Sequence, residues 1–283
     1  SQTLWHYGDC FKEFAYHSFL WAASNIIKSL TGIALVLLYG ELELLIIGIV
    51  FAEALALILS LYVIRRRFGP FAPKFQFSVW WDFLSRSAPI GLGVIFSVLY
   101  FRLDIVMLQL MTDDRVVGFY SAAYKLFEIV IVLPHSLMIV LFPSLVEEFH
   151  TDREKFKISF KKAFTVYFVV GSSIALVFFG FSNEIIGLIY GDNFLFSVKI
   201  LEILAIAIAL SFLIFLLSNI LIVSGWEMTN TWSLIGATIF NIALNLAWIP
   251  EHAGIGAAWA TVVCEITLIV ILGLQSRKAF KEP

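Results

Sequence analysis

Long apolar runs separated by short polar segments dominate the chain. Each run has the ~20 residues that a helix needs to cross the ~30 Å hydrocarbon core of a bilayer. None shows the period-two alternation that is typical of a transmembrane β-strand. The pattern therefore predicts an all-α membrane protein with about eight transmembrane helices. The predicted spans are residues 19–39, 44–64, 88–111, 116–145, 163–181, 198–223, 231–249 and 255–274.

Two segments between these spans have their own character. Residues 77–86 are aromatic and amphipathic and include Trp80 and Trp81, which favours a position in the membrane interface. Residues 147–162 are basic and form the longest polar segment. We expect this segment to be the longest soluble loop.

The composition excludes most other protein classes. The chain of 283 residues is 60% hydrophobic and 14% charged, with a mean hydropathy of +0.93, whereas a soluble domain has ~45–50% apolar and ~25% charged residues. A soluble enzyme, a secreted mini-protein and a disordered chain are therefore excluded. With 19 basic and 21 acidic residues, a nucleic-acid partner is not expected. Cys10 and Cys264 support neither a disulfide framework nor a metal site.

The basic residues between the spans predict the orientation. Cytoplasmic loops retain an excess of Lys and Arg, and here the basic residues concentrate in every second connection. The other connections are mainly acidic, with Glu41, Asp113, Glu184, Asp192 and Glu251 among their residues. We therefore expect a multi-pass protein of the cell membrane with both termini in the cytoplasm. The basic set is Arg65, Arg66, Arg67, Lys74, Arg153, Lys155, Lys157, Lys161, Lys162, Arg277, Lys278 and Lys281.

The first and last pairs of spans resemble each other at a shift of about 212 residues, which places Glu53 on Glu265 and Arg65 on Arg277. One interpretation is that any two membrane hairpins look alike. The other is a true repeat whose unit is a lobe of about six spans, a common transporter plan. On that interpretation, residues 1–76 are the last two helices of an N-terminal lobe with a cytoplasmic linker, and residues 77–283 are a complete six-helix C-terminal lobe.

Ionisable residues inside the spans are the candidates for function, because each costs at least ~2.5–3.5 kcal/mol at the bilayer centre. Arg102 and Asp104 on one span, and Lys125 and Glu128 on the next, are expected at comparable depth. Arg102 and Asp104 point to nearly opposite sides, whereas Lys125 and Glu128 are three residues apart and can pair. Either ion pairs hold the two helices together, or Arg102 and Lys125 line a hydrated cavity and bind an anion.

Three further polar residues are weaker candidates. Lys28 is a second cationic cavity candidate, although its side chain can instead reach the interface. Asn241 and Asn245 share a helical face and are expected to bond to a neighbouring helix. The chain has no Asp-rich metal–diphosphate motif, no Gly-rich phosphate loop and no HExxH, so we expect no enzyme, no cofactor and no metal.

Several motifs occur in a distinctive order. An Arg-x-Asp stands at Arg102 and Asp104, a Val-Gly-x-Tyr-Ser-x-Ala-Tyr at residues 117–124 and a Leu-Phe-Pro at residues 141–143. IIGLIYGDNF follows at residues 185–194 and NIALNLAWIPEHAGIGAAWATV at residues 241–262. In these motifs the chain resembles the polysaccharide biosynthesis (O-antigen, lipid-linked oligosaccharide flippase) family of the multidrug/oligosaccharidyl-lipid/polysaccharide exporter superfamily.

The resemblance implies two six-helix lobes, of which this chain looks like spans five to twelve, without the first four helices of the N-terminal lobe. It implies a transporter that moves a polyprenyl-(di)phosphate-linked oligosaccharide from the cytoplasmic to the outer leaflet by alternating access, for surface polysaccharide biosynthesis. Membrane lipids and a coupling cation would be further partners. Arg102 would bind the phosphate, with Lys28 and Lys125 as secondary cations, and Asp104 and Glu128 would orient the cations or carry the coupling ion.

The transport interpretation has a physical basis and two alternatives. A diphosphate headgroup cannot cross hydrocarbon unaided because its charges would lose their hydration, and Arg or Lys supply charge-assisted hydrogen bonds to it. A cation-coupled multidrug exporter of the same fold would instead need carboxylates that dominate the cavity. A membrane-embedded glycan-assembly enzyme would need a sizeable extracytoplasmic loop with catalytic acids.

Overall fold

The computed structural model describes residues 77–280 and scattered positions between residues 47 and 66. The chain divides into two compact units, Ser1–Phe77 and Ser78–Pro283, and the fold is described for the second. The predicted span 19–39 lies outside the described residues, as do most positions of the predicted span 44–64.

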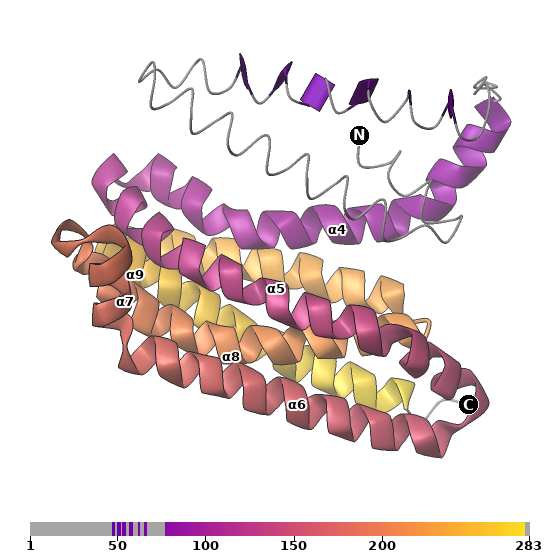
Figure 1. Cartoon of the computed structure of the whole chain (residues 1–283). Helices are drawn as coiled ribbons and strands as arrows, with labels where there is room; N and C mark the ends of the chain where they lie inside the picture. Colours follow the sequence, from indigo (N-terminus) through magenta and orange to yellow (C-terminus); the bar gives the residue numbers. More distant parts are fainter. Residues whose placement is uncertain are drawn as a thin grey trace. The chain divides into compact units, whose positions relative to one another are not determined.

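The described part of the second unit consists of helices, without a strand, which confirms the all-α prediction for this part. Only a few residues connect each element of this unit to the next, and Figure 1 shows the helices in chain order. The elements are α4 (Phe77–Met111), α5 (Asp114–Thr151), α6 (Arg153–Gly180), α7 (Ser182–Tyr190), the 3₁₀ helix η1 (Asp192–Phe194), α8 (Phe196–Val223) and α9 (Glu227–Ala279).

Within the described residues, α5, α6, α8 and α9 are long and apolar enough to cross a membrane. Large apolar side chains also remain on the outside of the unit, such as Ile139 (73% exposed), Val140 (75%) and Leu176 (72%). Soluble monomers rarely expose extensive apolar surface. The chain is therefore a multi-pass membrane protein, as its composition predicts.

The basic segment 147–162 is not a loop, so that prediction is wrong. Helix α5 runs to Thr151, α6 begins at Arg153, and Asp152 alone separates them. Lys and Glu are good helix formers, and Lys157 pairs with Glu154 along the first turns of α6. The charged composition marks where the chain leaves the membrane, but the helices continue beyond that point.

Helix α9 is a hairpin of two antiparallel halves. Its 53 residues would extend ~80 Å as a straight helix, but Ala253 has φ 50° and ψ −131°, which interrupts it. The two halves lie side by side, because Cys264 Sγ donates to the carbonyl of Ala237 (3.1 Å) and Gln275 Nε2 donates to Ser233 Oγ (2.8 Å). The predicted spans 231–249 and 255–274 are these two halves.

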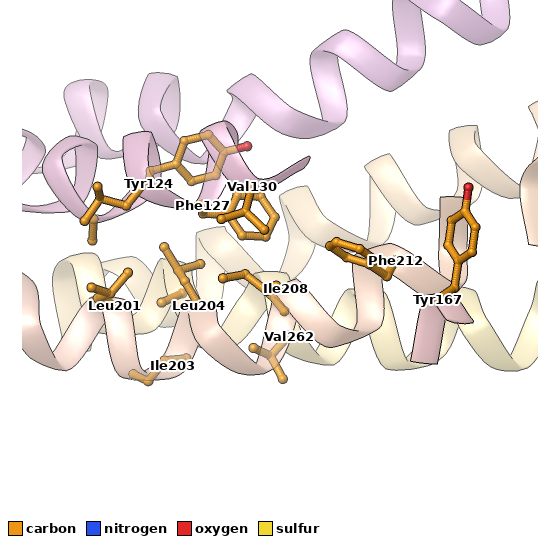
Figure 2. Packing of buried hydrophobic residues seen from close by; sticks show 14 of the residues in the cluster. Tyr124, Phe127, Val130, Tyr167, Leu201, Ile203, Leu204, Ile208, Phe212 and Val262 are labelled. Carbon is orange, nitrogen blue, oxygen red and sulfur yellow. The ribbon is translucent and has the colours of Figure 1, made fainter. Parts of the chain in front are cut away.

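Helix α8 forms the centre of the unit and packs against α5, α6 and α9. It is apolar on all sides, as expected for a helix buried on all sides. Figure 2 shows Tyr124, Phe127 and Val130 of α5 facing Leu201, Leu204 and Ile208 of α8. The second half of α9 contributes Val262 to the same cluster. This core fixes α5 and α9 around α8, and both helices carry candidate polar residues.

Candidate functional site

Arg102, Lys125 and Glu128 form one ion-pair cluster between α4 and α5. Arg102 Nη2 lies 2.5 Å from Glu128 Oε1, and Lys125 Nζ lies 2.9 Å from Glu128 Oε2. Each carboxylate oxygen therefore takes one cation, and the cluster carries a net charge of +1. The expected pair of Lys125 with Glu128 is present, and the contact of Arg102 with Glu128 places the three side chains at the same level of α4 and α5.

The two cations of this cluster remain accessible. The side chains of Arg102 and Lys125 are 52% and 62% exposed, whereas that of Glu128 is 24% exposed. A guanidinium has five N–H donors and an ammonium three, so one carboxylate leaves most of these donors unused. Arg102 also lies nine residues before the end of α4, about 13 Å along the helix. The cluster can thus accept an anion without first breaking its ion pairs.

Asp104 belongs to a separate, buried polar cluster. Its side chain is 2% exposed and accepts hydrogen bonds from Tyr120 Oη (3.0 Å), Asn245 Nδ2 (2.6 Å) and Thr261 Oγ1 (2.6 Å). Asn245 Nδ2 also donates to Asn241 Oδ1 (2.9 Å). These contacts connect α4 with α5 and with both halves of α9.

The Asp104 cluster corrects one role and confirms one expectation. Asp104 does not orient the cations: Arg102 pairs with Glu128, and the carboxylate of Asp104 faces hydroxyl and amide donors. The expected bond from the Asn241 and Asn245 face to a neighbouring helix is confirmed, with Asp104 as the partner. Sequence reasoning missed Tyr120 and Thr261. Thr261 was detectable as a polar residue in an otherwise apolar span, whereas Tyr120 resembles a core aromatic.

The described residues also form a recess of about 370 Å³ at the end of the unit where α5 and α8 begin. It is lined in part by Arg115 and Phe119 of α5, Asp192 of η1 and Ala253 at the turn of α9. Of the predicted site residues that the structure describes, none lines this recess. Lys28, the remaining predicted cation, lies outside the described residues.

The comparisons with known proteins agree with the sequence motifs. A family model described as "Polysaccharide biosynthesis protein" matches residues 10–150, about half of the chain. Among solved structures, one titled "Lipid II flippase MurJ, inward closed conformation" resembles the chain with a TM-score of 0.72 and 19% sequence identity. The match covers 91% of this chain and 56% of that one, so the chain spans little more than half of the length of that structure. At this identity the likeness shows the fold.

No curated protein matches the chain. The family model covers the Arg-x-Asp and Val-Gly-x-Tyr motifs of α4 and α5, and the fold likeness extends over nearly all of the remainder. The resemblance noted in the sequence is thereby confirmed. The chain is a multi-pass membrane protein of the polysaccharide biosynthesis family, within the multidrug/oligosaccharidyl-lipid/polysaccharide exporter superfamily.

Proposed function

We propose that the chain is the substrate-handling part of a flippase that moves a polyprenyl-(di)phosphate-linked oligosaccharide from the cytoplasmic to the outer leaflet by alternating access. The family assignment and the fold shared with a protein titled a lipid II flippase support this proposal. Both also favour transport over enzymatic chemistry. Residues 1–76 would then complete an N-terminal lobe, and residues 77–283 would form the C-terminal lobe.

The exposed cations of α4 and α5 are the observation that carries the proposal. Charged side chains within membrane helices face either the bundle interior or a water-filled cavity. Arg102 and Lys125 are more than half exposed, so water or an anionic group must reach them. A phosphate of the lipid-linked substrate is such a group, and its oxygens match the fork of N–H donors on Arg102. Lys28 would add a further cation from the N-terminal part.

The charge of this cluster distinguishes the proposal from its first alternative. A cation-coupled multidrug exporter would present an excess of carboxylates to its substrate. The cluster has two cations and one carboxylate, and that carboxylate is its least exposed member. The second alternative, a glycan-assembly enzyme, needs a large acidic loop. The connection between α6 and α8 is instead occupied by the short α7 and η1.

A coupling cation would fit the Asp104 cluster better than the Arg102 cluster. Asp104 supplies one negative charge, and Asn245 Oδ1 is buried without a hydrogen-bond partner in the described part of the chain. Carboxylate and amide oxygens are typical ligands of hard cations. A single carboxylate offsets a single positive charge, so the structure favours a monovalent cation.

Deletion of the gene that encodes the chain tests the proposed function. We expect lipid-linked oligosaccharide to accumulate in the cytoplasmic leaflet and surface polysaccharide to be lost, because the headgroup cannot cross hydrocarbon unaided. Reintroduction of the full-length gene should restore both. Normal surface polysaccharide in the deletion strain would contradict the proposal.

A further inference from the structure

Glu265 is a buried acid that the proposed mechanism does not use. It lies in the second half of α9 and is 1% exposed. Its Oε1 lies 2.5 Å from Ser211 Oγ of α8, and its Oε2 has no hydrogen-bond partner within the described residues. The ion pairs found in that part of the chain do not include it. An intramembrane carboxyl group without a cation requires an explanation.

The surroundings of Glu265 disfavour a negative charge. A buried carboxylate with one oxygen unpaired loses its hydration without compensation. The structure gives this bond as a donation from Ser211 Oγ to Oε1 of Glu265. A carboxylic acid removes the charge problem, because Ser211 Oγ can donate to its carbonyl oxygen or accept from its O–H, and neither oxygen is then charged.

Among the described residues, the charged group that acts on Glu265 is a second acid, whereas the cations Arg102 and Lys125 of α4 and α5 pair with Glu128. Asp104 of α4 and Tyr124 of α5 interact electrostatically with Glu265. The opposing half of α9 has no titratable residue between Glu227 and Glu251, and α8 contributes the hydroxyl of Ser211. Glu265 also lies one helical turn beyond Thr261, which binds Asp104. A second carboxyl group in the same apolar interior further disfavours a negative charge on Glu265.

We propose that Glu265 is a proton-binding site of this unit, distinct from the polar cluster around Asp104. The site binds one proton from water, which forms the O–H bond of the carboxylic acid, and releases the same proton when water reaches it. No other bond changes and nothing is oxidised or reduced. This inference rests on the proposed function: in a flippase, the site would supply a proton as a second coupling ion.

Infrared spectroscopy of the full-length protein tests the proposal without any transport assay. We expect a carbonyl band of a protonated carboxylic acid that is lost in Glu265→Gln, which keeps the shape and the contact with Ser211. The band should remain in Glu251→Gln, where the replaced acid is exposed. An identical band in the Glu265→Gln protein would overturn the proposal.

A second measurement on the unmutated protein separates an exchanging site from a permanent structural hydrogen bond. A proton-binding site should shift its carbonyl band on transfer to D₂O and lose it reversibly at alkaline pH. A band that survives both treatments unchanged would identify a fixed helix-to-helix contact and overturn the proposal. Because neither readout involves lipid-linked oligosaccharide, failure here is distinct from failure of the proposed function.

Discussion

Arg102 and Lys125 differ from ordinary intramembrane ion pairs because they share one acceptor. Glu128 gives one oxygen to each cation, so the cluster holds α4 to α5 and still keeps unused donors. The same three residues are therefore compatible with a structural role and with the proposed anion-binding role. The two roles depend on different residues. An ion pair that holds α4 to α5 needs Glu128 and Arg102 equally, whereas anion binding needs the cations Arg102 and Lys125.

Matched neutral substitutions separate these two roles. We expect Arg102→Gln to reduce flipping roughly tenfold or more, since a hydrogen bond to a charged group contributes ~1.5–3 kcal/mol. Glu128→Gln should retain most activity, because it leaves both cations in place. Restoration of surface polysaccharide in the deletion strain measures both, with protein abundance in the membrane as the control. Equal losses in the two variants would favour the structural role.

Asp104 leads to a separate prediction about the coupling cation. A cation that binds the folded protein and not the unfolded chain raises the melting temperature, and the rise grows with the ratio of cation concentration to Kd. We expect Na⁺, compared with choline at equal ionic strength, to raise the Tm of the unmutated protein in detergent. Asp104→Asn should abolish this rise because the only carboxylate of the cluster is lost. Glu202→Gln, which changes a carboxylate paired with Lys199, should keep it, and equal rises in all three proteins would contradict the assignment.

Helical spacing predicted part of this residue-level picture. The pairing of Lys125 with Glu128 follows from a separation of three residues within one helix. The partner of Asp104 does not follow from spacing, because Asn245 and Thr261 lie 141 and 157 residues away. That contact depends on how α4 and α9 rotate about their own axes when they pack, which the core around α8 decides.

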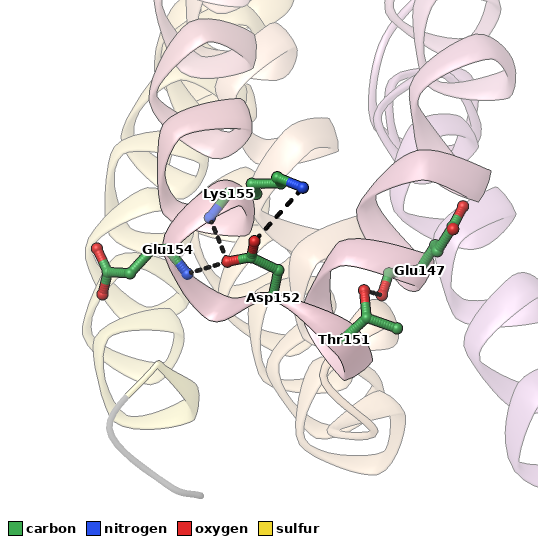
Figure 3. Close-up of polar contacts among 5 residues, drawn as sticks. All are labelled: Glu147, Thr151, Asp152, Glu154 and Lys155. Carbon is green, nitrogen blue, oxygen red and sulfur yellow. Dashed lines mark hydrogen bonds and ion pairs between the residues drawn. The ribbon is translucent and has the colours of Figure 1, made fainter.

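The corner between α5 and α6 shows how a single side chain separates two helices. Asp152 has extended backbone dihedrals and accepts hydrogen bonds from the amides of Glu154 (3.2 Å) and Lys155 (3.0 Å), as drawn in Figure 3. Its carboxylate also lies 3.6 Å from Lys155 Nζ. The bond from the Lys155 amide, aided by the lysine charge, lowers the pKa of Asp152 from its ordinary value of 3.8.

This cap predicts a pH dependence of the start of α6. Because the pKa of Asp152 is lower in the folded than in the unfolded chain, its stabilising effect is present above 3.8 and is lost as the pH falls through the lower folded value. The protection of the first amides of α6 against hydrogen exchange, relative to unstructured amides at the same pH, should therefore decrease in acid. Asp152→Asn, which caps without titrating, should remove this acid step, and Asp152→Ala should exchange faster at every pH. Equal acid steps in the unmutated and Asn proteins would contradict the prediction.

The contact between α6 and α8 depends on a glycine. A Cβ at Gly171 would lie 2.9 Å from Cβ and Cγ of Phe212, whose side chain is fully buried (Figure 2). Gly171→Ala should destabilise the protein by ~1–3 kcal/mol, the usual cost of overpacking, which thermal unfolding in detergent measures. Gly273→Ala is the control, because a Cβ there meets nothing within 4 Å. The same loss in both variants would indicate that backbone flexibility, not the Phe212 contact, requires glycine at residue 171.

The apolar pattern predicts the membrane-spanning cores of these elements better than their ends. Helix α4 joins the predicted interfacial segment 77–86 and the predicted span 88–111. Helices α5 and α6 extend into the basic segment beyond the membrane. Hydropathy indicates where a helix is surrounded by lipid, whereas hydrogen bonding and capping decide where it stops. The short α7 was missed because its nine residues are too few to stand out as a span.

At the scale of the whole molecule, the likeness of fold to a solved structure covers more of the chain than the sequence motifs do. Its helices enclose a core around α8, and one polar cluster joins α4, α5 and both halves of α9. The fold likeness covers 91% of this chain, although the family model ends at residue 150. The likeness of fold therefore reaches beyond the residues that the family model matches.

The orientation of this unit is the last prediction. Lys157 lies near the start of α6, and Glu184 lies in α7, which follows the other end of α6. Glu251 lies next to the turn of α9. All three side chains are exposed. Because the Lys157 end carries the basic residues, it should face the cytoplasm. In a background with Cys10→Ser, where Cys264 is buried, an impermeant maleimide should label Glu184→Cys and Glu251→Cys in intact cells. Lys157→Cys should react only after permeabilisation, and the reverse pattern would place the basic end outside.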